Sequence, residues 1–220
     1  MPGDTKQRLL DGALRAIHEH GIAGVSARTI AAAAGVNQAL IFYHYGGVDD
    51  LLAAACLAST TAEVARYAGR FAGAGSLREL LAVGRALHAE QRRVGNVSVL
   101  AQLLAAAQSD AKLAGPTATA LQLWIDEVES VLRRLLTGTP FAEVADLAGV
   151  ARAVSAAFIG LELYEGVDES GADQALAALD QLAVLVEVVD GLGPVARRAL
   201  RAKLARATTS PPAPATRRRG

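Results

Sequence analysis

Residues 26–45 read SARTIAAAAGVNQALIFYHY, and this stretch decides the fold of the N-terminal part of the chain. It predicts a short helix over about 27–34, a tight turn, and a second short helix that opens at Asn37. Ser26 stands where an N-cap side chain accepts a hydrogen bond from the first turn. Gly35 follows the apolar run, where helices commonly end in a left-handed residue that glycine adopts without strain. Two short helices joined in this way form a helix-turn-helix, whose second helix enters the major groove of DNA.

The outward face of the second helix is expected to carry amide and aromatic side chains. Asn37, which can also cap this helix, and Gln38 can pair with adenine edges, while aromatic rings can touch thymine methyl groups or reach phosphates through a hydroxyl. A helical hairpin with a few exposed aromatic residues is the alternative interpretation. Packing in a core does not easily explain two aromatic residues followed by a histidine and a third aromatic residue, which are Phe42, Tyr43, His44 and Tyr45.

This stretch resembles the N-terminal domain of TetR-type (tetracycline-repressor) transcriptional regulators. The signature comprises Ile30-Ala31, Ala34 to Asn37, Leu40 to Gly46 and Asp50 to Leu52, and the resemblance covers residues 5–55 closely. It implies DNA-backbone contacts at the start of the first short helix, from Ser26, Arg28 and Thr29. It implies a recognition helix that presents Asn37, Gln38, Ala39, Leu40, Phe42, Tyr43 and His44.

One position departs from the family pattern. The family usually has a lysine at the start of the next helix, where it meets a phosphate, and this chain has Val48. The departure removes one expected backbone contact. It keeps open an alternative function, a helical interaction module whose DNA-binding head is vestigial.

Composition favours an all-α protein. The chain has 220 residues, of which 52% are apolar and 4% aromatic, and alanine and leucine dominate at helical spacing. We expect a helix-turn-helix DNA-binding head at 1–47, a helical effector-binding and dimerisation domain at 48–206, and a disordered basic tail at 207–220.

The charge of the head is unusual for a DNA-binding domain. The chain has no net formal charge, and its first fifty residues contain four Lys or Arg and five Asp or Glu. Contacts with phosphates would therefore depend on Arg28, Lys6, hydroxyl groups, backbone N–H groups and helix N-termini. Residues 195–220 contain eight Lys or Arg and no acidic residue.

The rest of the chain shows a series of helical patterns. Gly115-Pro116 predicts a break before one helix, and Pro140 predicts the first position of another. Ser76 to Glu79 has the form of a capping box. The expected helices span about 5–20, 48–71, 77–93, 96–109, 116–136, 140–164, 173–192 and 194–206.

The helices expected near 140–164 and 173–192 have broad apolar and small-residue faces. These faces can be buried within one subunit or between two, and the residues alone leave both possibilities open. Resemblance to the family implies that two subunits join there as a homodimer, in a four-helix bundle across a two-fold axis. A dimer would place two recognition helices about 34–36 Å apart on a palindrome.

Resemblance to the family also implies a small-molecule effector site in the larger domain. An apolar cavity with few polar groups is normal for such a site, and a mostly apolar effector is expected. Each of the candidate lining residues can instead be an ordinary core residue. The candidates are Tyr67, Phe71, His88, Leu103, Gln122, Trp124, Phe158, Glu162 and Tyr164.

Other functions find little support in the sequence. We find no nucleophile elbow, phosphate-binding loop, dinucleotide fingerprint or zinc spacing, so we expect neither an enzyme nor a bound cofactor or metal. His18 and His20 point to different faces of a helix, and Cys56 lies among apolar residues and is interpreted as a packing residue. No signal pattern or membrane-length apolar run is apparent, which predicts a cytoplasmic protein without a membrane partner.

Overall fold

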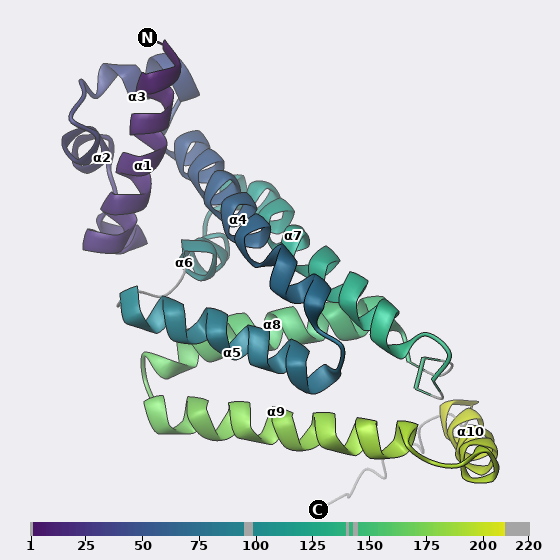
Figure 1. Ribbon diagram of the computed structural model, residues 1–220. Coiled ribbons are helices and arrows are strands. Elements are labelled where there is room, and N and C mark those ends of the chain that lie inside the picture. The colour runs from purple at the N-terminus through teal and green to yellow at the C-terminus, as the bar shows by residue number, and fades with distance from the viewer. Residues whose placement is uncertain (1, 95–98, 140, 143–144, 210–220) are drawn as a thin grey trace, which may run out of the picture.

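The computed structural model describes residues 2–94, 99–139, 141–142 and 145–209, and all of the regular elements within them are helical (Figure 1). The all-α prediction is therefore confirmed. The elements are α1 (Pro2–His20), η1 (Ile22–Gly24), α2 (Ala27–Ala34), α3 (Ala39–Tyr45), α4 (Val48–Gly73), α5 (Leu77–Val94), α6 (Val99–Ala106), α7 (Ala111–Leu136), α8 (Leu147–Glu165), α9 (Glu169–Asp190) and α10 (Pro194–Thr209).

Both ends of α2 are as the sequence predicts. Ser26 Oγ accepts a hydrogen bond from the Thr29 N–H at 3.2 Å, and the Ser26 N–H donates to Thr29 Oγ1 at 2.8 Å, which together make a capping box. Gly35 ends the helix with a φ of 63° and a ψ of 40°, in the left-handed region. The turn therefore has a fixed direction and sets the angle between α2 and α3.

Helix α1 crosses α2 very closely, and Gly12 makes this crossing possible. A Cβ atom at Gly12 would lie 2.6 Å from the Cβ atom of Ala34 and 2.9 Å from the Ala34 backbone. Distances this short do not occur between real carbon atoms, so any larger residue at Gly12 would push the two helices apart.

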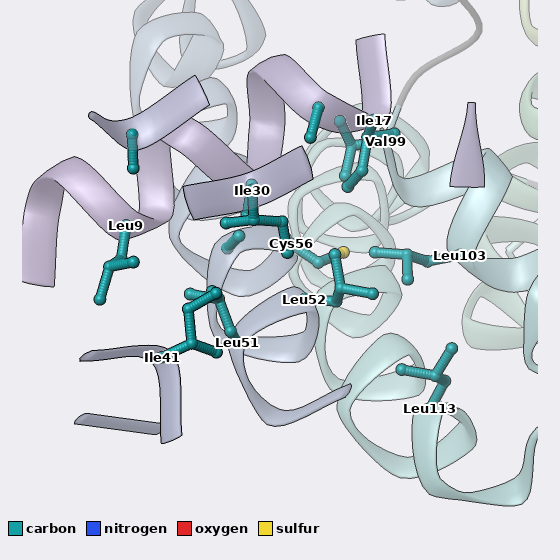
Figure 2. Packing of buried hydrophobic residues seen from close by; sticks show 14 of the residues in the cluster. Leu9, Ile17, Ile30, Ile41, Leu51, Leu52, Cys56, Val99, Leu103 and Leu113 are labelled. Atoms are coloured by element: carbon teal, nitrogen blue, oxygen red, sulfur yellow. The ribbon is translucent and has the colours of Figure 1, made fainter. Parts of the chain in front are cut away.

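The core of the head continues into the body of the molecule (Figure 2). Side chains from α1, α2 and α3 meet side chains from the first turns of α4 and from α6 and α7 in one cluster. Burial raises the pKa of Cys56 in this cluster to about 11, which agrees with its interpretation as a packing residue. The large members are Leu9, Ile17, Ile30, Ile41, Leu51, Leu52, Cys56, Val99, Leu103 and Leu113.

Helix α6 holds the head through a specific polar contact as well as through apolar packing. The Ile22 N–H, in the short η1 helix, donates to Gln102 Oε1 at 3.0 Å. Val99, one turn before Gln102, and Leu103, the residue after it, are buried in the head's core. A displacement of α6 would therefore act directly on the connection between α1 and α2.

The body is a bundle of long helices that extends away from the head (Figure 1). Helices α4 and α7 run side by side from the head to the far end, and α5, α8 and α9 pack below them. The C-terminal ends of α5 and α8 lie at the same end of the bundle, close to α6. The second core cluster comprises Tyr67, Phe71, Ala74, Leu80, Leu87, Ile125, Val128, Val131, Leu132, Leu136, Leu147 and Ala151.

The predicted break at 115–116 is wrong. Helix α7 starts at Ala111, where Asp110 Oδ1 accepts a hydrogen bond from the Lys112 N–H at 3.0 Å, and it continues through Pro116. Because Asp110 caps the helix more than a turn earlier, the proline falls in the second turn instead of the first. Pro116 therefore lies near the start of α7 but does not mark its first residue.

The predicted start of α8 is also wrong. Residue 140 itself lies outside the described residues, Phe141 and Ala142 form a turn, and the helix begins at Leu147. Asp146 is the cap, since its Oδ1 accepts from the Ala148 N–H at 3.1 Å. The predicted helix over 96–109 is described only as α6, because residues 95–98 are outside the described part and residues 107–109 form a turn. The predicted tail begins inside α10, and its residues 210–220 are also outside the described part.

Helices α8 and α9 share an apolar face that the rest of the subunit leaves uncovered. Leu163, Leu182, Leu185 and Val188 are 42%, 57%, 60% and 60% exposed. By length and composition α8 could also cross a membrane, and 28% of its apolar window is buried inside the subunit. An uncovered apolar face of this kind marks an interaction surface.

Candidate nucleic-acid interface and cavity

Helix α3 turns one side into the head and leaves the other open to solvent. Ile41 is fully buried and anchors the helix. On the opposite side, Phe42 is 55% exposed and Tyr43 80% exposed, and Gln38 in the preceding turn is exposed as well. Large aromatic side chains that stay in water, on a short helix fixed by one core residue, are available for a binding partner.

The two amides before α3 have different tasks. Asn37 Oδ1 accepts a hydrogen bond from the Ala39 N–H at 2.8 Å, so this oxygen caps the helix as the sequence predicts. Gln38 makes no side-chain hydrogen bond to the helix end. A bidentate contact with adenine needs both the oxygen and the nitrogen of an amide, and Gln38 can offer both.

Three of the predicted DNA-contacting residues are half-buried. Thr29 is engaged in the cap of α2, Leu40 packs partly against the head's core, and the His44 ring meets the Tyr43 ring edge-on with centroids 4.8 Å apart. The other predicted contacts are exposed, and their side chains lie at the start of α2 and along α3: Ser26, Arg28, Asn37, Gln38, Ala39, Phe42 and Tyr43.

Tyr45 belongs to a different surface from its aromatic neighbours. Its hydroxyl donates to the Lys6 carbonyl at 3.2 Å, and its ring packs partly against the head's core. Burial raises the pKa of Tyr45, so the hydroxyl stays protonated and keeps this donor role. Tyr45 therefore ties the end of α3 to α1.

Half of the basic side chains in the head have structural tasks. The Arg8 guanidinium donates to the carbonyls of Ala34 and Gly35 at 3.0 and 2.6 Å, and Arg15 donates to the Ala33 carbonyl at 2.7 Å. These bonds satisfy carbonyls that the end of α2 leaves without helical partners.

The basic side chains that remain for phosphates are few. Of the four Lys and Arg in the first fifty residues, Lys6 and Arg28 are left once Arg8 and Arg15 are assigned to α2. Val48, at the position where the family usually has lysine, is half-buried and packs against the head's core. The interface therefore depends on hydroxyls, amides and backbone N–H groups more than on charge.

A cavity of about 560 Å³ lies inside the body, between α4, α5, α6, α7, α8 and α9. A volume of this size is within the range of small-molecule sites. Phe71 and Trp124 meet edge-on in its wall, with ring centroids 6.2 Å apart. Four of the residues that we predicted as effector contacts line it: Phe71, Trp124, Phe158 and Glu162.

The other predicted effector contacts lie outside the cavity wall. Tyr67 is buried and donates to Glu90 Oε2 at 2.6 Å, and His88 is buried with its Nε2 3.0 Å from Glu165 Oε2. Leu103 belongs to the head's core, as its neighbour Val99 does.

Two further residues that we predicted as effector contacts make hydrogen bonds outside the cavity. Gln122 Nε2 donates to Asp126 Oδ1 at 2.6 Å, and the Tyr164 hydroxyl donates to Asp168 Oδ2 at 2.9 Å. Tyr164 is 47% exposed, and the bond to the carboxylate raises its pKa. Asp126 lies one turn after Gln122 on α7, whereas Asp168 is the N-cap of α9, just after the end of α8.

Sequence reasoning missed the polar part of the cavity wall. Its residues on α4 recur at positions 59, 60, 63 and 66, a spacing that places them on one helical face. Their periodicity was the available signal. The polar lining residues not predicted are His18, Ser59, Thr60, Glu63, Arg66, Arg85, Glu90 and Ser155.

Comparison with known proteins places the head in a family. Residues 9–55 match the family model described as bacterial regulatory proteins, tetR family. The HTH-type transcriptional repressor AcnR of Corynebacterium glutamicum is 36% identical over 53 residues, which are 24% of this chain and 28% of AcnR. The aligned stretch thus spans less than a third of AcnR.

Solved structures extend the similarity to the body. A TetR-family transcriptional regulator from Cytophaga hutchinsonii superposes with a TM-score of 0.68 at 16% identity, over 82% of this chain and 93% of its own. The multidrug binding protein EbrR, solved in complex with proflavin, superposes with a TM-score of 0.53 at 28% identity, over 80% of this chain and 99% of its own. The arrangement of head and helical body is common to all three chains.

Proposed function

Because this chain belongs to the TetR family of bacterial regulatory proteins, we propose that it is a transcriptional repressor that binds a palindromic operator as a homodimer and is released by a small-molecule effector. In this proposal residues 1–47 are the DNA-binding head and residues 48–206 are the effector-binding and dimerisation domain.

The observation that carries the proposal is the exposed face of α3. Gln38 and Tyr43 stand in solvent on a short helix whose opposite side is anchored by the buried Ile41. A helix-turn-helix reads DNA by placing the N-terminal residues of its second helix against base edges in the major groove. In this arrangement Gln38 contacts a base edge, and Tyr43 can contact a thymine methyl group or a phosphate.

The uncovered face of α8 and α9 supports a homodimer. Leu182, Leu185 and Val188 lie on it at about one-turn intervals, and each is more than half exposed. A second copy of the same face would bury these side chains across a two-fold axis. The two heads would then meet successive major grooves of a palindrome about 34–36 Å apart.

The position of the cavity supports control by a small molecule. Val99 and Leu100 line the cavity and also belong to the core of the head. Gln102, on the same short helix, holds the Ile22 N–H of the head. A ligand that displaces α6 would therefore change the orientation of the head. Such a ligand binds the two orientations of the head with different affinity, which is what an effector needs in order to control DNA binding. EbrR, with the same fold, was solved with proflavin bound.

Selection of bound sequences from a random DNA pool, with the purified full chain, tests the proposal. We expect enrichment of a palindrome whose half-sites are one helical turn apart. The symmetry of the enriched site reports the dimer, and a variant with Tyr43→Ala should fail to enrich it. A pool that returns without enrichment would contradict the proposed function.

The alternative is a helical interaction module with a vestigial head, and two observations favour it. Val48 replaces the usual phosphate-contacting lysine, and the bonds of Arg8 and Arg15 to carbonyls at the end of α2 engage two guanidinium groups that could otherwise donate to phosphates. A gel-shift series at increasing salt separates the two functions. Specific binding that weakens as the salt concentration rises supports the repressor, and absence of binding at low salt supports the interaction module.

A further inference from the structure

The cavity wall changes character along its length. On α5 the lining residues run from Leu77 and Leu80 to Leu87 and then Glu90, and on α8 they run from Val150 through Phe158 to Glu162. Both helices point in the same direction, with their C-terminal ends close to α6 (Figure 1). Glu90 and Glu162, the last lining residues of the two helices, therefore lie at the end of the cavity nearest the head, and the polar residues Arg85 and Ser155 stand earlier on them.

The opposite end of the cavity is apolar. It is lined from four helices and the α7–α8 connection by hydrocarbon and aromatic side chains. These are Leu77, Leu80, Val128, Leu132, Leu136, Phe141, Val150, Ala183 and Val186. A molecule that fills the cavity would thus place a hydrophobic part there and a polar group towards α6.

The polar end carries an excess of negative charge. Among the described residues that line the cavity, Glu63, Glu90 and Glu162 are carboxylates, and Arg66 and Arg85 are the guanidinium groups. Glu162 is 8% exposed, so its charge is screened less by water than that of a surface carboxylate. These carboxylates also have partners within the protein. A ligand would therefore meet carboxylates that already have partners, in a wall where carboxylates outnumber guanidinium groups among the described lining residues.

The two guanidinium groups are already committed to carboxylates. Arg66 donates to Glu63 Oε1 at 2.9 Å and to Glu90 Oε1 at 2.5 Å. Arg85 donates to Asp180 Oδ2 and, at 3.0 Å, to a backbone carbonyl of α9. An anionic ligand would have to break one of these ion pairs while approaching a buried carboxylate. The chemistry of the wall therefore opposes an anionic head group.

Aromatic rings in the same wall suit a positive head group. Phe71, Trp124 and Phe158 all line the cavity, and Trp offers the strongest cation–π face among the aromatic side chains. Aromatic walls combined with a carboxylate are the recurring solution for organic cations, because an ammonium group with alkyl substituents is weakly hydrated and fits against a ring.

We propose that this cavity takes an amphipathic organic cation, with its hydrocarbon part between α7 and the start of α8 and its positive group near Glu162. Release of DNA by such a ligand rests on the proposed function, whereas binding of the ligand does not. The two can therefore be tested separately.

Trp124 provides a direct readout, because it is the single tryptophan of the sequence and it lines the cavity. The experiment titrates the full-length protein, without DNA, with dodecyltrimethylammonium, dodecanol and dodecanoate, each far below its micellar concentration. These probes share one chain length and differ in charge. We expect the cation to change the Trp124 fluorescence at a concentration at least about tenfold lower than dodecanoate does.

Two substitutions locate the binding of the cation. We expect Glu162→Gln to weaken the cation about tenfold and to leave dodecanol unchanged, because only the charge is removed. Glu63→Gln, on another helix and in a more exposed place, is a second variant for the case that Glu162→Gln disturbs folding, and it should act in the same direction. Glu129→Gln is the matched control, since Glu129 pairs with Arg133 and is not among the residues that line the cavity.

Equal affinity for the three probes, tighter binding of dodecanoate, or no response to any probe would overturn the proposal. Equal losses for cation and alcohol in both glutamate variants would also overturn it, since the charge would then have no role. Adding the cation to the protein bound to its selected DNA tests the other claim. Binding without release would contradict effector control while supporting the ligand class.

Discussion

At the scale of single residues, Asn37 and Gln38 are adjacent amides with different duties. The side-chain oxygen of Asn37 accepts a hydrogen bond at the start of α3. The Gln38 side chain makes no such bond, so its amide oxygen and nitrogen can both contact a base. We predict that Gln38→Ala lowers the affinity for the selected operator by about 1–3 kcal/mol, because one bidentate base contact is lost. The melting temperature should stay unchanged. Fluorescence anisotropy with labelled operator measures the effect, and Gln7→Ala on α1 is the control; an unchanged Kd would remove Gln38 from base readout.

Gly12 provides a prediction about stability. Gly12→Ala should lower the free energy of unfolding by about 1–3 kcal/mol, because its Cβ would lie 2.6 Å from that of Ala34. Gly69→Ala is the matched control, since Gly69 also lies inside a helix and a Cβ there would meet nothing within 4 Å. It should be neutral or stabilise by up to about 1 kcal/mol. Urea unfolding measures both, and equal effects of the two substitutions would refute the close crossing of α1 and α2.

Local signals predicted local structure well. Ser26 and Gly35 act within a few residues of themselves, so their roles as caps follow from the order of residues along the chain. Arg8 and Arg15 donate to carbonyls 27 and 18 residues away, and no local sequence pattern predicts these hydrogen bonds. The low charge of the head could therefore be read from the sequence. The hydrogen bonds of Arg8 and Arg15 to the end of α2 could not.

At the scale of elements, the uncovered face of α8 and α9 leads to a prediction about assembly. Leu185→Glu should weaken the proposed dimer at least about 30-fold, because a carboxylate would be buried between two apolar faces. Sedimentation equilibrium should then find the mass of a single 22.7 kDa chain. Val195→Glu is the control, because Val195 is 83% exposed on α10 and lies outside this face. A dimer that survives Leu185→Glu would place the interface elsewhere.

The start of α9 has a pH-dependent cap. The backbone N–H of Gly171, the Tyr164 hydroxyl and the Ser170 hydroxyl all donate to Asp168 and lower its pKa. A lowered pKa in the folded state means that the ionised cap stabilises the protein above the ordinary pKa of Asp, about 3.9, and is lost as the pH falls through the folded value. Asp168→Asn, which keeps a capping oxygen, should be less stable than the parent protein at pH 7. The difference should shrink in acid, as thermal melts across pH can measure.

The starts of α7 and α8 show why some helix boundaries were predicted less accurately than others. Proline rules placed two starts at 116 and 140, whereas Asp110 and Asp146 cap the helices where the structure begins them. An aspartate and a nearby proline are both ordinary start signals, and they compete when they stand several residues apart. The choice between them depends on packing that the local sequence does not contain.

At the scale of the whole molecule, the shortage of free basic side chains predicts an unusually weak dependence on salt. Lys6 and Arg28 in each of two heads would give about four charged phosphate contacts, so a plot of log K against log salt should have a slope of about −4. Val48→Lys in both subunits should steepen it to about −5 or −6. Titrations at several salt concentrations measure the slope. A parent slope near zero would contradict DNA binding, and a slope near −10 would reveal contacts beyond these.

The cavity could be predicted only in part. Aromatic residues on inward stripes, such as Trp124 and Phe158, follow from helical spacing and do line it. Tyr67 and His88 have the same spacing but are turned to carboxylate partners on neighbouring helices. Whether an inward residue lines the cavity or packs against a neighbouring side chain depends on how the six helices around the cavity are placed. That placement is a property of the assembled bundle.

Helix α6 also constrains how the specificity of such a protein can be altered by evolution or by an engineer. Val128 and Leu132 line the cavity and belong to the core of the body, whereas Val99 and Leu100 line the cavity and belong to the core of the head. A substitution at either of them that adapts the protein to a new small molecule also shifts its resting affinity for DNA. If the proposed effector control holds, recognition of a new small molecule is therefore expected to arise first through substitutions on α5, α7 and α8, with α6 unchanged.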